Sequence, residues 1–212
     1  MIKKVVPRFE DDKYWDGWQS PGAKLLNIGC GHKPFEGFIN VDNLNVEGIE
    51  YSNTDARDLS AIKDESIDYI YACHILEHMP RNDTFKALTE WSRVLKTGGV
   101  IRISVPDWDA TVRYYQESQD LENVLNWIYG GREREELNEF THRRIFNLPN
   151  LRSLLYEAGF KRIEKYNPWD TFHGNIDDFS FAYRPHMDFE NGIAMSLNCL
   201  LYTSDAADEE DS

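Results

Sequence analysis

The sequence predicts an α/β fold built on one mostly parallel sheet. Short apolar runs alternate with amphipathic segments from Lys24 onward, which is the pattern of parallel strands joined by helices. Polar or glycine residues follow several of these runs, where a parallel sheet places its ligand site. The 212 residues are 41% hydrophobic and 13% aromatic, which suits one well-buried globular domain.

Five strands are expected in the first half of the chain. Each is a short run of aliphatic, β-branched or aromatic residues bounded by turn or polar residues, and the third run is weaker than the others. The expected strands are residues 24–28, 38–41, 49–51, 67–72 and 100–105.

The clearest helix lies between the last two of these strands. Asn82 or Asp83 can cap its start, and the Thr-Gly-Gly segment at 97–99 is expected to end it. Apolar residues recur at helical spacing, and the first three of them are expected to pack in the core. They are Phe85, Leu88, Trp91 and Leu95.

The pattern changes after Pro106, where two helices follow each other directly. Further on, a helix and two strands complete the predicted fold. The expected helices are residues 107–119, 121–129 and 151–157, and the expected strands are residues 160–166 and 193–200.

These patterns divide the chain into three parts. Residues 1–21 form an N-terminal cap segment, and residues 22–200 form the main domain, with helical and loop covers at about 107–149 and 167–192. Loops on a rigid sheet commonly carry specificity, so the covers are expected to face the substrate. Residues 201–212 change abruptly to small and acidic residues, and we expect a tail that is non-native or disordered.

Charge and cysteine content limit the classes of function. The formal net charge is −14, or −9 without the five acids of the tail, which disfavours extended binding to nucleic-acid phosphates. The three cysteines are far apart, which argues against a disulfide framework and for a reducing compartment, the cytoplasm. No apolar run reaches the roughly 20 residues of a membrane span, and no signal-peptide core follows Met1.

Four of the expected strand ends carry residues suited to a nucleoside-like ligand. Gly29 and Gly31 lack side chains, so the backbone can approach a ligand closely. Asp42, eleven residues after Gly31, is placed to accept hydrogen bonds from the two hydroxyls of a ribose. Asp55 can meet an adenine amino group. His74 stands where the site would open to the substrate.

Five segments resemble the class I S-adenosylmethionine-dependent methyltransferases in order and spacing. They are "LLNIGCG", "FINVD", "NTDARDL", "SIDYIYACHILEH" and "LTEWSRVLKTGGVIRISVPD", and the closest likeness is to the type 11, small-molecule branch. The resemblance covers about residues 22–107 and continues loosely through "LRSLLYEAGFKRIEKY". It implies a Rossmann-like fold with a seven-stranded, mostly parallel sheet, helices on both faces and an antiparallel last strand at "GIAMSLNCL".

The resemblance also implies an enzyme that uses S-adenosylmethionine and releases S-adenosylhomocysteine. The glycines would pass beneath the methionine part of the cofactor, the first acid would hold the ribose, and the second would flank the adenine. The residues expected at the cofactor are Asn27, Gly29, Cys30, Gly31, Asp42, Asn43, Asp55, Ala56 and His74. Two positions depart from the family pattern: many relatives have Asp in place of Asn27 and Gly in place of Lys33.

His74 is the first candidate for a catalytic residue, and His142 is the second. A neutral imidazole at the strand end could take a proton from a hydroxyl or amine acceptor. Trp15 and Trp18 are candidates for capping the site, although packing on the domain is an equal alternative. Other polar candidates are more simply explained as surface or loop residues: Arg143, His173, Asp177 and Asp178.

The segment His74-x-x-Glu77-His78 has three interpretations. A zinc-protease motif H-x-x-E-H is disfavoured, because a strand ends just before it and Pro80 follows it. Catechol-type and small-RNA-end methyltransferases, which carry Glu-x-x-Glu-His here, imply a divalent metal site completed by a residue such as His142. The favoured interpretation is structural, with no metal.

We therefore expect a cytoplasmic S-adenosylmethionine-dependent methyltransferase that acts on a hydroxyl or amine of a small molecule or glycan precursor. The alternatives are a metal-assisted O-methyltransferase of an RNA end or phenol, and a cofactor-binding module without turnover. Base methylation of nucleic acid is disfavoured by the acidic body and by "ACHILEH" where an amino-methylation motif would stand. A homodimer is compatible with the sequence.

Overall fold

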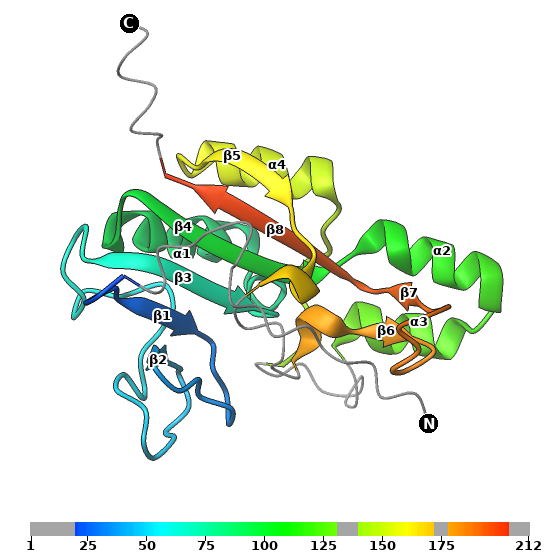
Figure 1. The fold of residues 1–212 in the computed structure, drawn as a ribbon. Coiled ribbons are helices and arrows are strands. Elements are labelled where there is room, and N and C mark those ends of the chain that lie inside the picture. The colour runs from blue at the N-terminus through cyan, green and yellow to red at the C-terminus, as the bar shows by residue number, and fades with distance from the viewer. Residues whose placement is uncertain (1–19, 131–139, 172–177, 204–212) are drawn as a thin grey trace, which may run out of the picture.

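A six-stranded sheet forms the centre of the protein in the computed structural model, which describes residues 20–130, 140–171 and 178–203. The strand order is β2-β1-β3-β4-β8-β5 (Figure 1). The first four pair in parallel, and β8 runs antiparallel between β4 and β5, as expected for the last strand. The strands are β1 (Leu25–Ile28), β2 (Ile39–Val41), β3 (Ile67–Cys73), β4 (Leu95–Pro106), β5 (Lys161–Lys165) and β8 (Ser196–Tyr202).

The strand expected at 49–51 does not form, so the sheet has six strands and not seven. Only one parallel bridge, between Val41 and Tyr51, marks the expected position beside β2. Tyr51 exchanges backbone hydrogen bonds with residues 40 and 42. The chain then turns away at Asn53, whose φ of 53° is incompatible with an extended strand.

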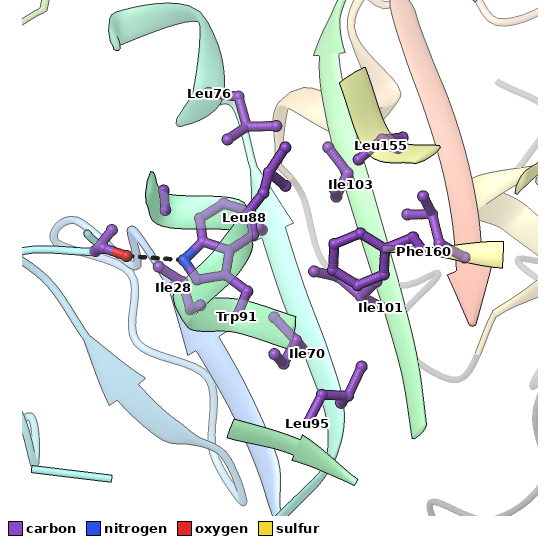
Figure 2. Close-up of a cluster of buried hydrophobic side chains, with 14 of the residues drawn as sticks. Ile28, Ile70, Leu76, Leu88, Trp91, Leu95, Ile101, Ile103, Leu155 and Phe160 are labelled. Carbon is purple, nitrogen blue, oxygen red and sulfur yellow. Dashed lines mark hydrogen bonds between the residues drawn. The ribbon is translucent and has the colours of Figure 1, made fainter. Parts of the chain in front are cut away.

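One face of the sheet is covered by the helices α1 (Arg81–Val94) and α4 (Leu148–Glu157). Ile70 and Ala72 of β3 point to this face, since side chains of a strand alternate between the two faces. Trp91 of α1 is fully buried against them, and its indole nitrogen donates to the Ala56 carbonyl at 2.9 Å (Figure 2). This face contains the largest apolar cluster of the protein's described residues.

The opposite face is aromatic and, toward the carboxyl ends of the strands, polar. Tyr69 and Tyr71 of β3 point to it, in a cluster to which no helix of the described residues contributes. Arg102 of β4 is fully buried there, with its guanidinium 5.4 Å from the Tyr69 ring and 5.3 Å from the Tyr166 ring. Among the described residues, α1 and α4 cover the first face, and the 3₁₀ helix η4 (Phe179–Phe181) lies against the second, where the Tyr71 hydroxyl bonds its N-cap residue Asp178.

The remaining elements lie beyond the carboxyl edge of the sheet (Figure 1). The helices α2 (Trp108–Ser118) and α3 (Leu121–Tyr129) pack there beside the short pair β6 (Tyr183–Arg184) and β7 (Ile193–Ala194). Three short 3₁₀ helices complete the described elements: η2 (Leu76–His78), η3 (Pro168–Asp170) and η4 (Phe179–Phe181). No helix of the described residues has the length and apolar character to cross a membrane.

Several boundaries differ from the prediction because tertiary packing sets them. Helix α1 begins at Arg81 behind Pro80, so neither Asn82 nor Asp83 caps it. It ends at Val94, before the 97–99 segment expected to stop it, and Leu95 is the first residue of β4. A Cβ on Gly99 would lie 2.7 Å from Leu95 Cγ, so the missing side chain lets Leu95 turn inward.

Two further differences from the prediction concern Phe85 and the C-terminal strand of the sheet. Phe85 is 41% exposed on α1 and does not join the core, whereas Leu88 and Trp91 do. The run expected at 193–200 divides into β7 and β8, and β8 continues to Tyr202. Leu201 is fully buried, so the first two residues of the expected tail belong to the sheet.

Trp91→Phe should lower the free energy of unfolding by about 1–3 kcal/mol, because it removes the buried indole hydrogen bond and leaves a small void. Urea denaturation followed by circular dichroism measures this change. Phe85→Ala on the same helix is the matched control and should change stability by less than about 0.5 kcal/mol, since its side chain is exposed. Equal losses in the two variants would contradict the assigned core.

Candidate active site

The glycine turn after β1 is tight on one side and open on the other. Gly29 and Gly31 have φ values of 75° and 53°, which side chains rarely adopt. A Cβ on Gly29 would lie 2.8 Å from Ile75 Cδ1, whereas a Cβ on Gly31 would meet nothing within 4 Å. The backbone at Gly31 therefore faces open space, as a ligand-binding turn requires.

Asp42 is held in place by the glycine turn. Its carboxylate accepts hydrogen bonds from the backbone N–H groups of Gly31 at 2.7 Å and Leu44 at 2.8 Å, one to each oxygen. The residue is only 7% exposed. Because each carboxylate oxygen has two acceptor sites, both oxygens can still accept a hydrogen bond from a hydroxyl. Asn43, the next residue, is exposed.

The Asn27 side chain is part of a buried amide pair. Its Nδ2 donates to Oδ1 of Asn40 at 3.0 Å, and Asn40 in turn bonds the backbone of Phe35 and Phe38. The pair therefore fixes the loop that follows the glycine turn.

Asp55 and Ala56 lie beside Asp42, because the N–H of Thr54 donates to the Asp42 carbonyl at 2.9 Å. The Asp55 carboxylate is engaged by Arg57 through Nε at 2.8 Å and Nη2 at 2.5 Å, and this partner lowers its pKa. The Ala56 carbonyl accepts the Trp91 indole hydrogen bond. The structure thus brings both expected adenine neighbours to the site edge, with the Asp55 side chain already paired.

Cys30 lies between the two glycines as a buried thiol. Burial, and next the nearby Asp42 carboxylate, raise the pKa of Cys30 to about 11. The thiol is therefore protonated at neutral pH, and its Sγ lies 3.7 Å from the Gly31 carbonyl as a weak donor.

His74 ends β3 in a strained conformation and is fixed on all sides. Its φ is 54°, and its N–H donates to the Ser104 carbonyl at 2.8 Å. Nδ1 lies 2.9 Å from Oε1 of Glu77, and Nε2 lies 2.9 Å from Oγ of Ser196. Strain of this kind persists only where the surrounding structure over-determines it, and it is concentrated at functional sites.

The hydrogen bonds of Ser196 determine which hydrogens His74 carries. Oγ of Ser196 donates its only hydrogen to the Phe179 carbonyl, at 2.6 Å. Oγ must therefore accept from Nε2 of His74, so that nitrogen bears a hydrogen. A base role for Nε2 requires Ser196 to give up this arrangement.

Glu77 is a fully buried carboxylate surrounded by histidines. Oε1 lies 2.9 Å from Nδ1 of His74 and 3.9 Å from Nε2 of His142, and neither oxygen accepts a hydrogen bond of regular geometry from the described residues. Burial alone would raise the pKa of Glu77, but the attraction of His74, His78 and His142 lowers it below its usual value. The carboxylate is therefore ionised.

His78 and His142 complete a cluster with Glu77, in which one candidate ligand atom from each residue lies within 4.8 Å of the others. The two imidazole rings are 4.9 Å apart, and Nδ1 of His78 is buried without a hydrogen-bond partner among the described residues. Burial lowers the pKa of His142 to about 4, with Glu77 offsetting this only in part. His142 is therefore neutral at pH 7 and has a lone pair to offer.

Backbone contacts bring His142 to this position. The N–H groups of Arg143 and Arg144 both donate to the Glu77 carbonyl, at 2.6 Å and 3.1 Å. Gly130 provides the room, because a Cβ there would lie 2.9 Å from Nε2 of His142. The Arg143 side chain itself is exposed, as expected for a surface residue.

Three residues that surround His74 were not indicated by the sequence. Trp127 and Phe179 flank its ring at centroid distances of 5.7 Å and 5.4 Å, and Ser196 fixes its Nε2. No local pattern distinguishes them; the aromatic content of the late loop was the only signal. Of the other sequence candidates, Trp15, Trp18, His173 and Asp177 lie outside the described residues, and Asp178 caps η4.

Comparison with known proteins identifies the family of the chain. The profile of the methyltransferase domain family matches residues 3–165. No curated protein matches the sequence significantly.

Several solved structures share the fold. An S-adenosylmethionine-dependent methyltransferase of Thermotoga maritima, described as a possible histamine N-methyltransferase, is 18% identical with a TM-score of 0.57, covering 85% of this chain and 82% of its own. Such an enzyme from Methanosarcina mazei is 16% identical with a TM-score of 0.56, covering 88% and 95%. One from Archaeoglobus fulgidus is 16% identical with a TM-score of 0.52, covering 85% and 86%.

Proposed function

The chain belongs to the methyltransferase domain family and is an S-adenosylmethionine-dependent enzyme, and we propose that its acceptor is a hydroxyl or amine of a small molecule or glycan precursor. The product of the cofactor is S-adenosylhomocysteine. The net charge of −14 supports this class of acceptor over a nucleic acid, because polyanions are repelled. The three cysteines are free thiols, which supports a cytoplasmic location.

Asp42 is the observation that supports the cofactor site most strongly. A buried carboxylate at the end of β2, fixed by two backbone N–H groups, is suited to the paired hydroxyls of a ribose. The open backbone at Gly31 leaves room for the methionine part beside it. Ala56 and Asp55 follow on the other side, where the adenine would lie.

The glycine turn suits a cofactor with a short, non-phosphorylated tail, because the Asp42 carboxylate beside it would repel a phosphate. Asn27 and the protonated Cys30 add no charge there. A helix N-terminus, the usual partner of a pyrophosphate, does not follow the turn in the described residues. These features support S-adenosylmethionine over a dinucleotide.

Methyl transfer requires mainly orientation and the removal of one proton. The sulfonium supplies a strong electrophile, so the protein has to align the acceptor and the methyl group. We assign His74 to the reacting end because it follows β3 at the same sheet edge, and His142 lies next to it through Glu77. The His74 ring is a wall of the acceptor site. In the tautomer that carries its hydrogen on Nδ1, directed at Glu77, Nε2 has a free lone pair and accepts the proton of the acceptor.

A second candidate function is favoured by the cluster of Glu77, His78 and His142. Two imidazoles and one carboxylate form a ligand set for Zn²⁺, Mn²⁺ or Fe²⁺. Oε2 of Glu77 and Nδ1 of His78 are buried without a hydrogen-bond partner among the described residues. A divalent metal held there would polarise a hydroxyl and lower its pKa. In that case the enzyme would be a metal-assisted O-methyltransferase of a phenol or an RNA end.

Asp42→Ala should weaken binding of S-adenosylhomocysteine by about 10- to 100-fold, because it removes charge-assisted hydrogen bonds to the ribose. Isothermal titration calorimetry measures this affinity, with the melting temperature as a check on folding. Asp64→Ala is the control, since the Asp64 side chain is 73% exposed and away from the turn. An unchanged affinity in Asp42→Ala would reject the ribose assignment.

His74→Ala should leave the affinity for S-adenosylhomocysteine within about 3-fold but lower kcat by about 100-fold or more, because the proton acceptor is lost. Release of S-adenosylhomocysteine over a panel of hydroxyl and amine acceptors is the readout. Full activity in this variant would remove His74 as a catalytic residue. A wild type that binds the cofactor product but methylates no acceptor would support the module without turnover.

The metal-assisted function predicts that dialysis against EDTA abolishes turnover and that Zn²⁺ or Mn²⁺ restores it. His142→Asn should then lose metal binding in calorimetry, whereas His186→Asn, which changes an exposed histidine outside the cluster, should not. Turnover that survives removal of metal would reject this second function and leave the metal-free one.

A further inference from the structure

Phe179 is exposed to solvent although it lies at the proposed reaction centre. Its side chain is 65% exposed, the highest value among the large apolar side chains of the described residues. Its ring centroid lies 5.4 Å from that of His74, with the two planes tilted by 43°. An exposed aromatic ring beside the proposed catalytic residue is available to contact a bound molecule.

The exposure of Phe179 does not come from a loose backbone. Its carbonyl accepts two hydrogen bonds, from Oγ of Ser196 at 2.6 Å and from the N–H of Ala182 at 3.0 Å. The two residues after it, Ser180 and Phe181, are buried. The chain therefore turns the phenyl ring outward from a fixed position.

Side chains of the central sheet hold the neighbours of Phe179 as well. The Tyr71 hydroxyl donates to Oδ2 of Asp178 at 2.5 Å, and Oδ1 of Asp178 accepts from the N–H of Ser180 at 2.8 Å. Nδ2 of Asn198 donates to the Ser180 carbonyl at 3.0 Å. Rigid placement of an exposed aromatic side chain lowers the entropy that a ligand would lose on binding.

Trp127 is the second aromatic residue in contact with the His74 ring. Its ring lies 5.7 Å from His74 at 67°, and the residue is 9% exposed. Its indole nitrogen is buried and has no hydrogen-bond partner within the described ranges. Trp127 therefore supports the His74 ring from inside the protein, whereas Phe179 contacts it from the solvent side.

We propose that Phe179 is the stacking platform for the methyl acceptor, which therefore carries a ring with one apolar face. Aromatic rings, and the C–H faces of sugars, both pack flat on a phenyl ring. Because the Phe179 ring lies next to His74, a ring bound on its exposed side lies beside the proposed reaction centre. This inference rests on the proposed methyl transfer and names the class of acceptor within it.

The test compares Phe179→Ala, Phe179→Trp and the control Phe85→Ala, which removes a 41% exposed phenyl ring from helix α1. The acceptor panel has three arms: phenols and aminophenols, methyl glycosides, and acyclic polyols and amines of similar size. Initial rates give KM and kcat for each arm, and calorimetry with S-adenosylhomocysteine shows that the cofactor site is intact.

The platform predicts a KM about 10-fold or more higher in Phe179→Ala for the ring-bearing arm that the enzyme uses, with kcat within about 3-fold. Phe179→Trp should restore KM, and Phe85→Ala should leave it unchanged. Which of the two ring arms is used identifies the acceptor as aromatic or sugar. An unchanged KM in Phe179→Ala, or a preference for acyclic acceptors, would overturn the inference.

A binding measurement separates this inference from the methyl transfer itself. Saturation-transfer NMR on the protein loaded with S-adenosylhomocysteine detects ring compounds whether or not they are methylated. A signal that is lost in Phe179→Ala and kept in Phe85→Ala supports the platform even without turnover. Equal signals in both variants reject the platform, whatever the activity.

Discussion

The buried carboxylate of Glu77 is the constraint on which the rest of the site depends. Taking an ionised carboxylate out of water costs several kcal/mol unless charged or hydrogen-bonding partners replace the solvent. Here those partners are the histidines around it, and the nearest, His74, lies at 2.9 Å. His74 also contacts Ser196 through Nε2. The backbone carbonyl of Glu77 accepts hydrogen bonds from the N–H groups of Arg143 and Arg144, next to His142. Strand β3, the chain after α3 and the start of β8 thus meet at one point.

Much of the fold followed from local sequence patterns, and so did the cofactor side of the proposed site. Gly29, Gly31 and Asp42 lie at strand ends, where a short apolar run and the residue after it suffice to place them. The strands and α1 were predicted for the same reason, although Phe85 and the ends of α1 were wrong. Those errors arise where packing decides, as at Gly99, whose missing side chain leaves room for the buried Leu95 side chain.

The acceptor side was not predictable in this way. Ser196 meets His74 across 122 residues of sequence, and Tyr71 meets Asp178 across 107. Neither contact is indicated by hydrophobic periodicity or motif spacing in the sequence, because each depends on how distant segments fold against one sheet edge. The hydrogen bond between Asn27 and Asn40 was not predicted either: Asn27 stood out in the sequence as an unusual residue, but nothing in the sequence indicated its partner.

The position of β8 constrains the order in which the protein can assemble. It is the last strand of the described residues, yet it lies inside the sheet between β4 and β5. Strand β5 has no neighbour in the sheet until β8 is inserted, and this late pairing joins residues far apart in the sequence, which slows folding. Ser196 begins β8. The proposed catalytic residue His74 therefore acquires its final orientation only when the sheet itself is complete, so a partly folded chain lacks the arrangement around His74.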